Sequence, residues 1–237
     1  MEKNISLLLE KARMIREEAE KIVLASRVFE SWESVGGEVR PVGSFAMGLL
    51  MKHRDLDFHI YTSELQCADG LAALERMARG GGGIVLKGME FQDLSRTEEC
   101  CLEWHVRVCA EKEKSVAAGE RESGKKTAAL PSGLSALPDE PAQRNPMTEE
   151  WQIDMIQILR GSRYDGYFER VAERIRAVLT PETRLAILSL KDRAPAEARV
   201  PGIAFYRAVI GDGVRTWPEF EHWLRQHPLS GILEWMP

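Results

Sequence analysis

The stretch VGSFAMGLLMKHRDLDFHIYT, residues 42–62, decides the fold that this sequence predicts. It opens on Gly43 and Ser44, and after ten further residues an alternation of polar and apolar side chains begins at Asp55. Alternation with a period of two predicts a β-strand over residues 56–61. Glycine lets the backbone turn sharply and lets a phosphate approach it, and the serine starts a short predicted helix whose N–H groups favour an anion.

Two carboxylates, those of Asp55 and Asp57, stand two residues apart at the start of this strand. Both therefore project from one face of the sheet, with their Cα atoms about 6.5–7 Å apart. At that separation they can share one divalent cation, or hold two ions ~3.5–4 Å apart. Because the ligands are oxygen atoms only, the pattern predicts Mg²⁺ or Mn²⁺ rather than Zn²⁺.

A third carboxylate is expected from a neighbouring strand. Asp154 is the candidate, as a lone acid in the apolar segment WQIDMI, residues 151–156. A carboxylate in such a segment is unfavourable unless a cation or hydrogen bonds compensate its charge. A metal site shared with Asp55 and Asp57 would supply that compensation.

Periodicity along the whole chain predicts an α+β protein with a helical C-terminal portion. A run of two glycines, Gly36 and Gly37, should end the first helix. The expected helices cover residues 5–32, 45–50, 64–79, 164–179, 181–192, 202–210 and 217–225, and the expected strands cover residues 38–42, 56–61, 84–91, 101–109 and 151–159.

Composition limits the class of protein. The net charge is −5, so a long nucleic acid is a disfavoured partner. The four cysteines have no metal-binding spacing, which predicts free thiols in a reducing compartment. We find no apolar signal region at the N-terminus and no stretch of the ~20 apolar residues that a membrane span needs, so we expect a cytoplasmic protein without a membrane partner.

The spacing from Gly43-Ser44 to Asp55-x-Asp57, with the later Asp154, resembles the signature of the nucleotidyltransferase superfamily that includes DNA polymerase β. A longer resemblance to stand-alone bacterial nucleotidyltransferase-like proteins of unassigned substrate rests on residues 43–62, 149–184 and 219–237. It implies a mixed β-sheet with flanking helices, a nucleotidyltransferase domain over residues 1–160 and a helical domain over residues 161–237.

The resemblance also implies roles for these residues. Asp55 and Asp57 would hold the metal that carries a nucleoside triphosphate, and Asp57 and Asp154 would hold a second metal, with Asp154 as the general base. Gly43 and Ser44 would bind the β- and γ-phosphates. In-line attack on the α-phosphorus by a hydroxyl of a small molecule or protein would release pyrophosphate. The alternative is a non-catalytic nucleotide-binding or antitoxin-like module of the same fold.

Further residues are candidates with plainer alternatives. Arg54, Tyr164 and Lys191 are predicted to contact the nucleotide. The alternatives are a solvated loop for Arg54, interdomain packing for Tyr164 and a solvated charge for Lys191. His59 and His105 can border the cleft, or pack within the sheet. The glycine run at residues 80–83 follows a helix and precedes a strand, which favours a flexible turn over a phosphate loop. Three tryptophans of the helical portion are expected in its core: Trp217, Trp223 and Trp235.

Residues 111–148 are rich in Ala, Ser, Gly, Pro, Glu and Lys and nearly lack large apolar side chains. Such a segment cannot bury enough apolar surface to order itself, so we expect a mobile loop that joins two neighbouring strands. Because a surface loop changes stability only logarithmically with its length, deleting residues 111–148 should leave the melting temperature nearly unchanged. A large drop in a thermal melt would show that the segment packs on the body.

Overall fold

The computed structural model describes residues 2–79, 83–110, 149–195, 198, 200–228 and 235–237. Five strands form one sheet in the order β1-β2-β5-β4-β3. Neighbours β2 and β5 run parallel, whereas the other adjacent pairs are antiparallel. The strands are β1 (Glu38–Pro41), β2 (Asp55–Thr62), β3 (Ile84–Asp93), β4 (Cys101–Ala110) and β5 (Trp151–Leu159). This confirms the α+β class and the mixed sheet.

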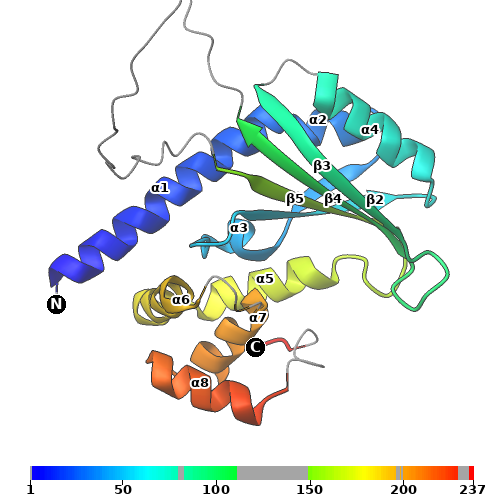
Figure 1. Cartoon of the computed structure of the whole chain (residues 1–237). Coiled ribbons are helices and arrows are strands. Elements are labelled where there is room, and N and C mark those ends of the chain that lie inside the picture. The colour runs from blue at the N-terminus through cyan, green and yellow to red at the C-terminus, as the bar shows by residue number, and fades with distance from the viewer. Residues whose placement is uncertain (1, 80–82, 111–148, 196–197, 199, 229–234) are drawn as a thin grey trace, which may run out of the picture.

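Helices flank the sheet on both faces (Figure 1). They are α1 (Glu2–Ser26), α2 (Val28–Glu33), α3 (Gly43–Met47), α4 (Cys67–Arg79), α5 (Tyr167–Val178), α6 (Pro181–Arg193), α7 (Gly202–Tyr206) and α8 (Trp217–Gln226). The predicted helix over residues 202–210 is shorter, because after Tyr206 the chain continues as a π-helical turn over Arg207–Gly211. None of the described helices is long and apolar enough to cross a membrane.

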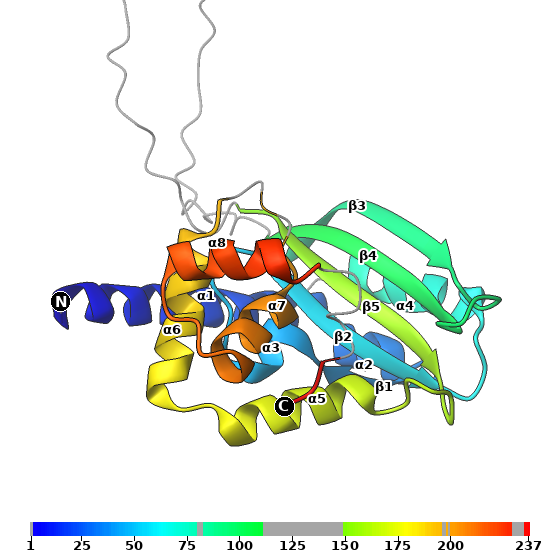
Figure 2. The same cartoon turned by 90° about the horizontal axis from the view of Figure 1, so that it is seen from below.

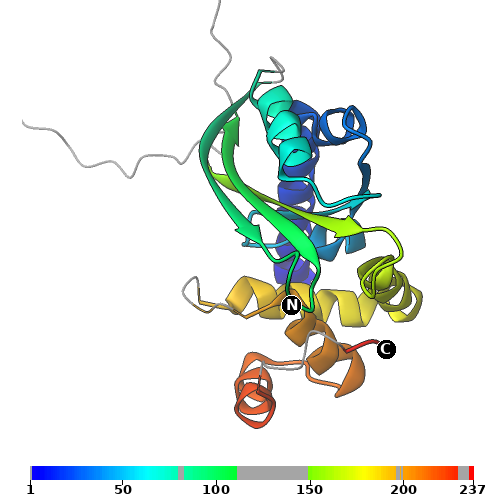
Figure 3. The ribbon, with the colours of Figure 1, turned by 90° about the vertical axis from the view of Figure 1, so that its right-hand side faces the viewer.

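One face of the sheet packs on α1, α2 and α4, as the side view shows (Figure 3). The apolar stripe predicted for the first helix is buried there, with Ala12, Ile15, Ala19 and Ile22 all less than a tenth exposed. The sheet contributes the apolar half of each alternating strand. These residues include Leu56, Phe58 and Ile60 of β2, Trp104, Val106 and Val108 of β4, and Trp151, Ile153 and Met155 of β5. The polar half is thereby left on the opposite face.

The single helix predicted over residues 5–32 is wrong, because the chain breaks at Arg27. This residue has φ 51°, in the left-handed region, and separates α1 from α2. The break turns α2 so that Val28 and Trp32, which are out of phase with the stripe on α1, become fully buried. Trp32 Nε1 then donates to Met155 Sδ on β5 over 3.0 Å.

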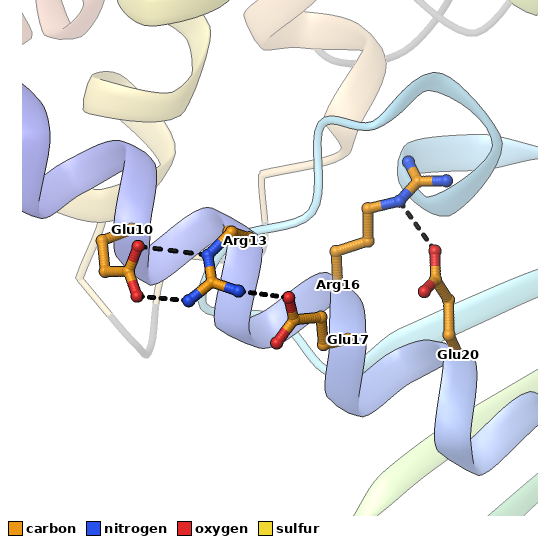
Figure 4. Close-up of polar contacts among 5 residues, drawn as sticks. All are labelled: Glu10, Arg13, Arg16, Glu17 and Glu20. Carbon is orange, nitrogen blue, oxygen red and sulfur yellow. Dashed lines mark hydrogen bonds and ion pairs between the residues drawn. The ribbon is translucent and has the colours of Figure 1, made fainter.

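The solvent side of α1 carries ion pairs at helical spacing (Figure 4). Arg13 contacts Glu10 and Glu17, and Arg16 Nε donates to Glu20 Oε1 over 2.9 Å. Exposed pairs of this kind add only about 0.3–0.5 kcal/mol each to a helix. The position of α1 therefore depends on its buried stripe rather than on these charges.

The C-terminal helices lie against the polar face of the sheet (Figures 1 and 2). They build a second hydrophobic cluster, which also takes in Met47 of α3 and Leu49. The three tryptophans expected in this core contribute to it, with Trp223 buried and Trp217 and Trp235 packed around it. At the start of α5, Tyr61 of β2 accepts from Gly166 N at 3.0 Å and donates to Glu169 Oε1 at 2.6 Å.

Strands β4 and β5 are antiparallel neighbours, so residues 111–148 connect two adjacent strands as expected. These residues and residues 80–82 lie outside the described part of the chain, and the expectations of a mobile loop and a flexible turn stay predictions. All four cysteines are described and are free, with Cys101 buried and Cys67 exposed.

Gly70 shows how tightly α4 packs on the sheet. A Cβ at this position would lie 2.2 Å from Cζ2 of Trp104, whose side chain is fully buried. Helix propensity favours alanine over glycine by ~1 kcal/mol, but overpacking a buried site costs about 1–3 kcal/mol.

Gly70→Ala should therefore lower the free energy of unfolding, measured by urea denaturation, in spite of its better helix propensity. The control is Leu71→Ala on the exposed side of the same helix, which should change stability little. A more stable Gly70→Ala variant would contradict this packing.

Candidate functional site

The polar face of the sheet sets three carboxylates side by side. Asp57 on β2 is opposite Asp154 on β5, and Asp154 is in turn opposite His105 on β4. Asp55 stands two residues before Asp57 on β2, opposite Gln152. Because side chains alternate along a strand, all of these residues project from the same face. The structure thus brings together the three acids that the sequence singles out.

Gly43 lies directly against Asp57. Its φ is 63°, and a Cβ there would lie 1.9 Å from Oδ2 of Asp57. The backbone is fixed beside β2 by a hydrogen bond of 2.9 Å from Val42 N to the carbonyl of Asp57. Glycine is needed here for two reasons, its positive φ and the carboxylate that fills the space of a side chain.

Ser44 is held by a lysine from the C-terminal helices. Lys191 of α6 is only 6% exposed, and its Nζ donates to Ser44 Oγ at 2.7 Å, to Leu49 O at 3.0 Å and to Tyr206 OH at 3.0 Å. The hydroxyls of Ser44 and Tyr206 also lie 3.0 Å apart. All three protons of the ammonium group therefore have an acceptor, and its charge stands beside the acids.

The electrostatics of Asp57 reflect this crowding of like charges. Burial and the nearby carboxylates of Asp55 and Asp154 raise the pKa of Asp57 to about 7, and the Lys191 ammonium only partly offsets them. At neutral pH Asp57 is therefore partly protonated, and the three acids carry less than their full negative charge unless a cation binds to them.

Asp154 has partners that the sequence does not reveal. Its Oδ1 lies 2.6 Å from Nδ1 of His105, and Gln152 Nε2 donates to the same carboxylate at 2.8 Å and 3.1 Å. On its other side, His105 Nε2 lies 3.3 Å from Glu103 Oε2. Burial lowers the pKa of His105, but the hydrogen bonds and charges of Asp154 and Glu103 outweigh it and raise the pKa above its ordinary value.

Hydrogen bonds therefore compensate the Asp154 carboxylate without a metal. Within the described residues, no group of three or more His, Cys, Asp and Glu side chains is arranged to hold a metal ion. The Asp154 carboxylate lies against His105 and Gln152 on one side and is opposite Asp57 on the other. The oxygen-only donors and the raised pKa of Asp57 still suit a hard cation such as Mg²⁺.

The three acids open into a cavity of about 390 Å³, which we call the acid cavity. Its walls come from the sheet, from α3 and from the C-terminal helices. Besides the acids, they include Gly43, Ser44, His59, His105, Phe168 and Tyr206. Both histidines considered as cleft residues thus line the cavity, and His59 is 6% exposed.

A neighbouring cavity of about 340 Å³ carries basic side chains, and we call it the lysine cavity. Lys52, His53 and Lys191 line it. It shares Ser44 and Asp55 with the acid cavity, so the two spaces meet at the Gly-Ser turn.

Two of the predicted nucleotide contacts lie elsewhere. Arg54 lines neither cavity, because its guanidinium pairs with Glu18 at 3.3 Å and with Glu149 at 2.5 Å. Tyr164 lines a third cavity, of about 490 Å³, which we call the aromatic cavity. The sequence also missed Tyr206, for which no local pattern offers a signal.

Comparisons of the chain with protein-family models, with curated proteins and with solved structures find no match. The resemblance to nucleotidyltransferases therefore remains a prediction from the motifs.

The raised pKa of Asp57 predicts a pH-dependent stability in the absence of metal. An acid whose pKa is raised in the folded state makes its full contribution to the free energy of unfolding below its unfolded pKa of about 3.9. This contribution is lost as the pH rises toward 7. The loss is at most ~4 kcal/mol, and less because Asp57 is only partly buried and borders the acid cavity.

Asp57→Asn should therefore melt at a higher temperature than the parent at pH 8 in EDTA, by a few degrees, and the gain should shrink at pH 5. Thermal melts at both pH values test this. A constant difference between the two proteins at both pH values would contradict the raised pKa.

Proposed function

We propose that this chain is a metal-dependent nucleotidyltransferase that moves a nucleoside monophosphate from a triphosphate to a hydroxyl of an acceptor and releases pyrophosphate. The observation that carries the proposal is the row of Asp57 and Asp154 on parallel neighbouring strands, with Asp55 one step away and Gly43 packed on Asp57. Carboxylates so close together are unfavourable without a cation, and Mg²⁺ accepts oxygen ligands of this kind.

The charges on the two cavities favour one orientation of the nucleotide. The lysine cavity offers Lys52, His53 and Lys191 to a triphosphate, and it meets the acids at Ser44 and Asp55. Lys191 can exchange Ser44 or Tyr206 for a phosphate oxygen without losing its other hydrogen bonds. A Mg²⁺ ion held by Asp55, Asp57 and Asp154 would neutralise phosphate charge during the transfer.

We assign the role of proton acceptor to Asp154, which is opposite Asp57 on the neighbouring strand. In the proposed reaction an acceptor hydroxyl oxygen bonds to the α-phosphorus, the bond from that phosphorus to the pyrophosphate oxygen breaks, and the hydroxyl proton passes to Asp154. His105 Nδ1, 2.6 Å from Asp154 Oδ1, orients this carboxylate and can share its proton. Preorganised groups of this kind act by holding the reacting atoms in line.

A non-catalytic nucleotide-binding or antitoxin-like module is the alternative. The observation that favours it is that His105 and Gln152 already satisfy Asp154, so this acid does not depend on a metal. The two proposals differ in turnover, because a module of this kind would bind a nucleotide without releasing pyrophosphate.

The first test is binding. Titration of ATP into the protein should give heat only with Mg²⁺ present, and Asp55→Asn and Asp57→Asn should abolish this binding while the fold persists. The matched control is Asp93→Asn, which removes an exposed acid at the end of β3 and should bind as the parent does. Full Mg²⁺-dependent binding by both active-site variants would rule out the site.

The second test separates binding from chemistry. Asp154→Asn keeps the shape of the side chain and removes its basicity, so it should bind Mg²⁺–ATP within a few fold of the parent. Its pyrophosphate release should be slower by at least ~10²-fold, the lower end of general-base contributions. Slow hydrolysis by water serves as the readout until an acceptor is known. Turnover equal to that of the parent would show that Asp154 has a structural role and is not the general base.

A further inference from the structure

The aromatic cavity lies next to the acid cavity and shares part of its wall. His59 of β2, Ile156 of β5 and Phe168 of α5 line both spaces. His59 and Ile156 stand two residues after Asp57 and Asp154 on their strands, so they project from the same face of the sheet. A molecule in the aromatic cavity would therefore extend toward the acids from the side opposite the lysine cavity, which meets them at Asp55.

One wall of the aromatic cavity consists of rings. Tyr164 and Phe168 are stacked, with centroids 6.1 Å apart and planes 27° apart, and Tyr167 meets Phe168 edge-on at 5.1 Å. Phe168 also packs edge-on against His59 at 5.1 Å. Cζ of Arg163 lies 5.4 Å from the centroid of Tyr164, so this ring already has one cation beside it.

Two carboxylates also line the cavity. They belong to Glu103 on β4 and to Glu99, which precedes that strand. Neither lysine nor arginine is among the described residues that line the cavity. Rings and carboxylates that line the same space form a site that attracts an organic cation and repels an anion.

A buried polar atom on the shared wall also makes no hydrogen bond. His59 is 6% exposed, and its Nδ1 has no hydrogen bond in the described structure. Its only contact with a carboxylate among the described residues is Glu169 Oε1 at 3.7 Å, an ion pair when His59 is protonated, and this oxygen also accepts from Tyr61. A buried polar group left in this state is unfavourable, so its place between two cavities indicates a site that a ligand completes.

We propose that the aromatic cavity holds the acceptor, and that the acceptor is a small alcohol carrying an ammonium group. This inference rests on the proposed function for the transfer itself, but not for the binding of the cation. A volume of about 490 Å³ suits a small molecule. The ammonium group would lie between the rings and Glu103, and the hydroxyl would reach past His59 to Asp154.

The assignment gives each cavity one role in the transfer. The triphosphate enters over Lys191 in the lysine cavity, and the hydroxyl oxygen approaches the α-phosphorus from the aromatic cavity. In-line displacement needs the attacking and leaving oxygens on opposite sides of the phosphorus, and this order of cavities provides that. A phosphorylated or nucleic acid acceptor would instead place its charge against Glu99 and Glu103.

Binding of the cation is tested without nucleotide or metal. Benzylamine, which is a cation at pH 7.5, should bind at least ~10-fold tighter than benzyl alcohol, and benzoate should not bind, as measured by ligand-observed NMR titration. Glu103→Gln and Tyr164→Ala should each weaken benzylamine about tenfold, whereas Tyr164→Phe should retain it. The matched control is Glu75→Gln on α4, on the other face of the sheet.

Equal affinity for the cation and the alcohol would overturn the proposal, as would unchanged benzylamine binding in both Glu103→Gln and Tyr164→Ala. Because Glu103→Gln replaces one polar group with another of the same shape, it keeps the test valid even where Tyr164→Ala loses stability.

The acceptor role is tested with Mg²⁺ and ATP. A set of phenyl amino alcohols, with the hydroxyl at different distances from the ammonium group, should include members that raise pyrophosphate release above the rate with water. Glu103→Gln and Tyr164→Ala should each raise KM for such an acceptor about tenfold.

The two proposals fail in different ways. Cation binding and Mg²⁺–ATP binding without any acceptor-dependent release would overturn the acceptor role and leave nucleotide binding intact. Absence of Mg²⁺–ATP binding would overturn the proposed function, and the acceptor role with it.

Discussion

The site depends on the parallel pairing of β2 with β5 in the register that sets Asp57 opposite Asp154. Parallel neighbours are joined by a crossover, and here the chain passes through α4, β3 and β4 before it returns. The register is fixed from the other face, where Ile153 and Met155 are fully buried. A slip of one residue would exchange these side chains with Asp154 and bury an acid in the apolar core.

Features with a local pattern were predictable, whereas features made by distant residues were not. The strands follow from alternation, and β5 has the bounds that its apolar run predicts. The break at Arg27 had no signal, because a left-handed residue other than glycine leaves none in a sequence. Arg54 looked like a phosphate ligand beside the acids, but Glu18 of α1 and Glu149 neutralise it, and only the fold brings them there.

His105 changes how Asp154 is understood. An acid in an apolar strand has two means of compensation, a cation or hydrogen bonds, and the structure shows the second. Since Glu103 holds the far side of the imidazole, the ring connects Asp154 to the wall of the aromatic cavity. A ligand that bound to Glu103 would therefore alter the hydrogen bonding of Asp154 through one intervening side chain.

Gly43 has a consequence for judging which other sequences keep this site. Since Oδ2 of Asp57 occupies the space where a Cβ would stand, a mutation at this position displaces the carboxylate even when all three acids are retained. A search that scored only the acids would count such a gene as intact. The codon of Gly43 therefore has to be scored together with those of Asp55, Asp57 and Asp154.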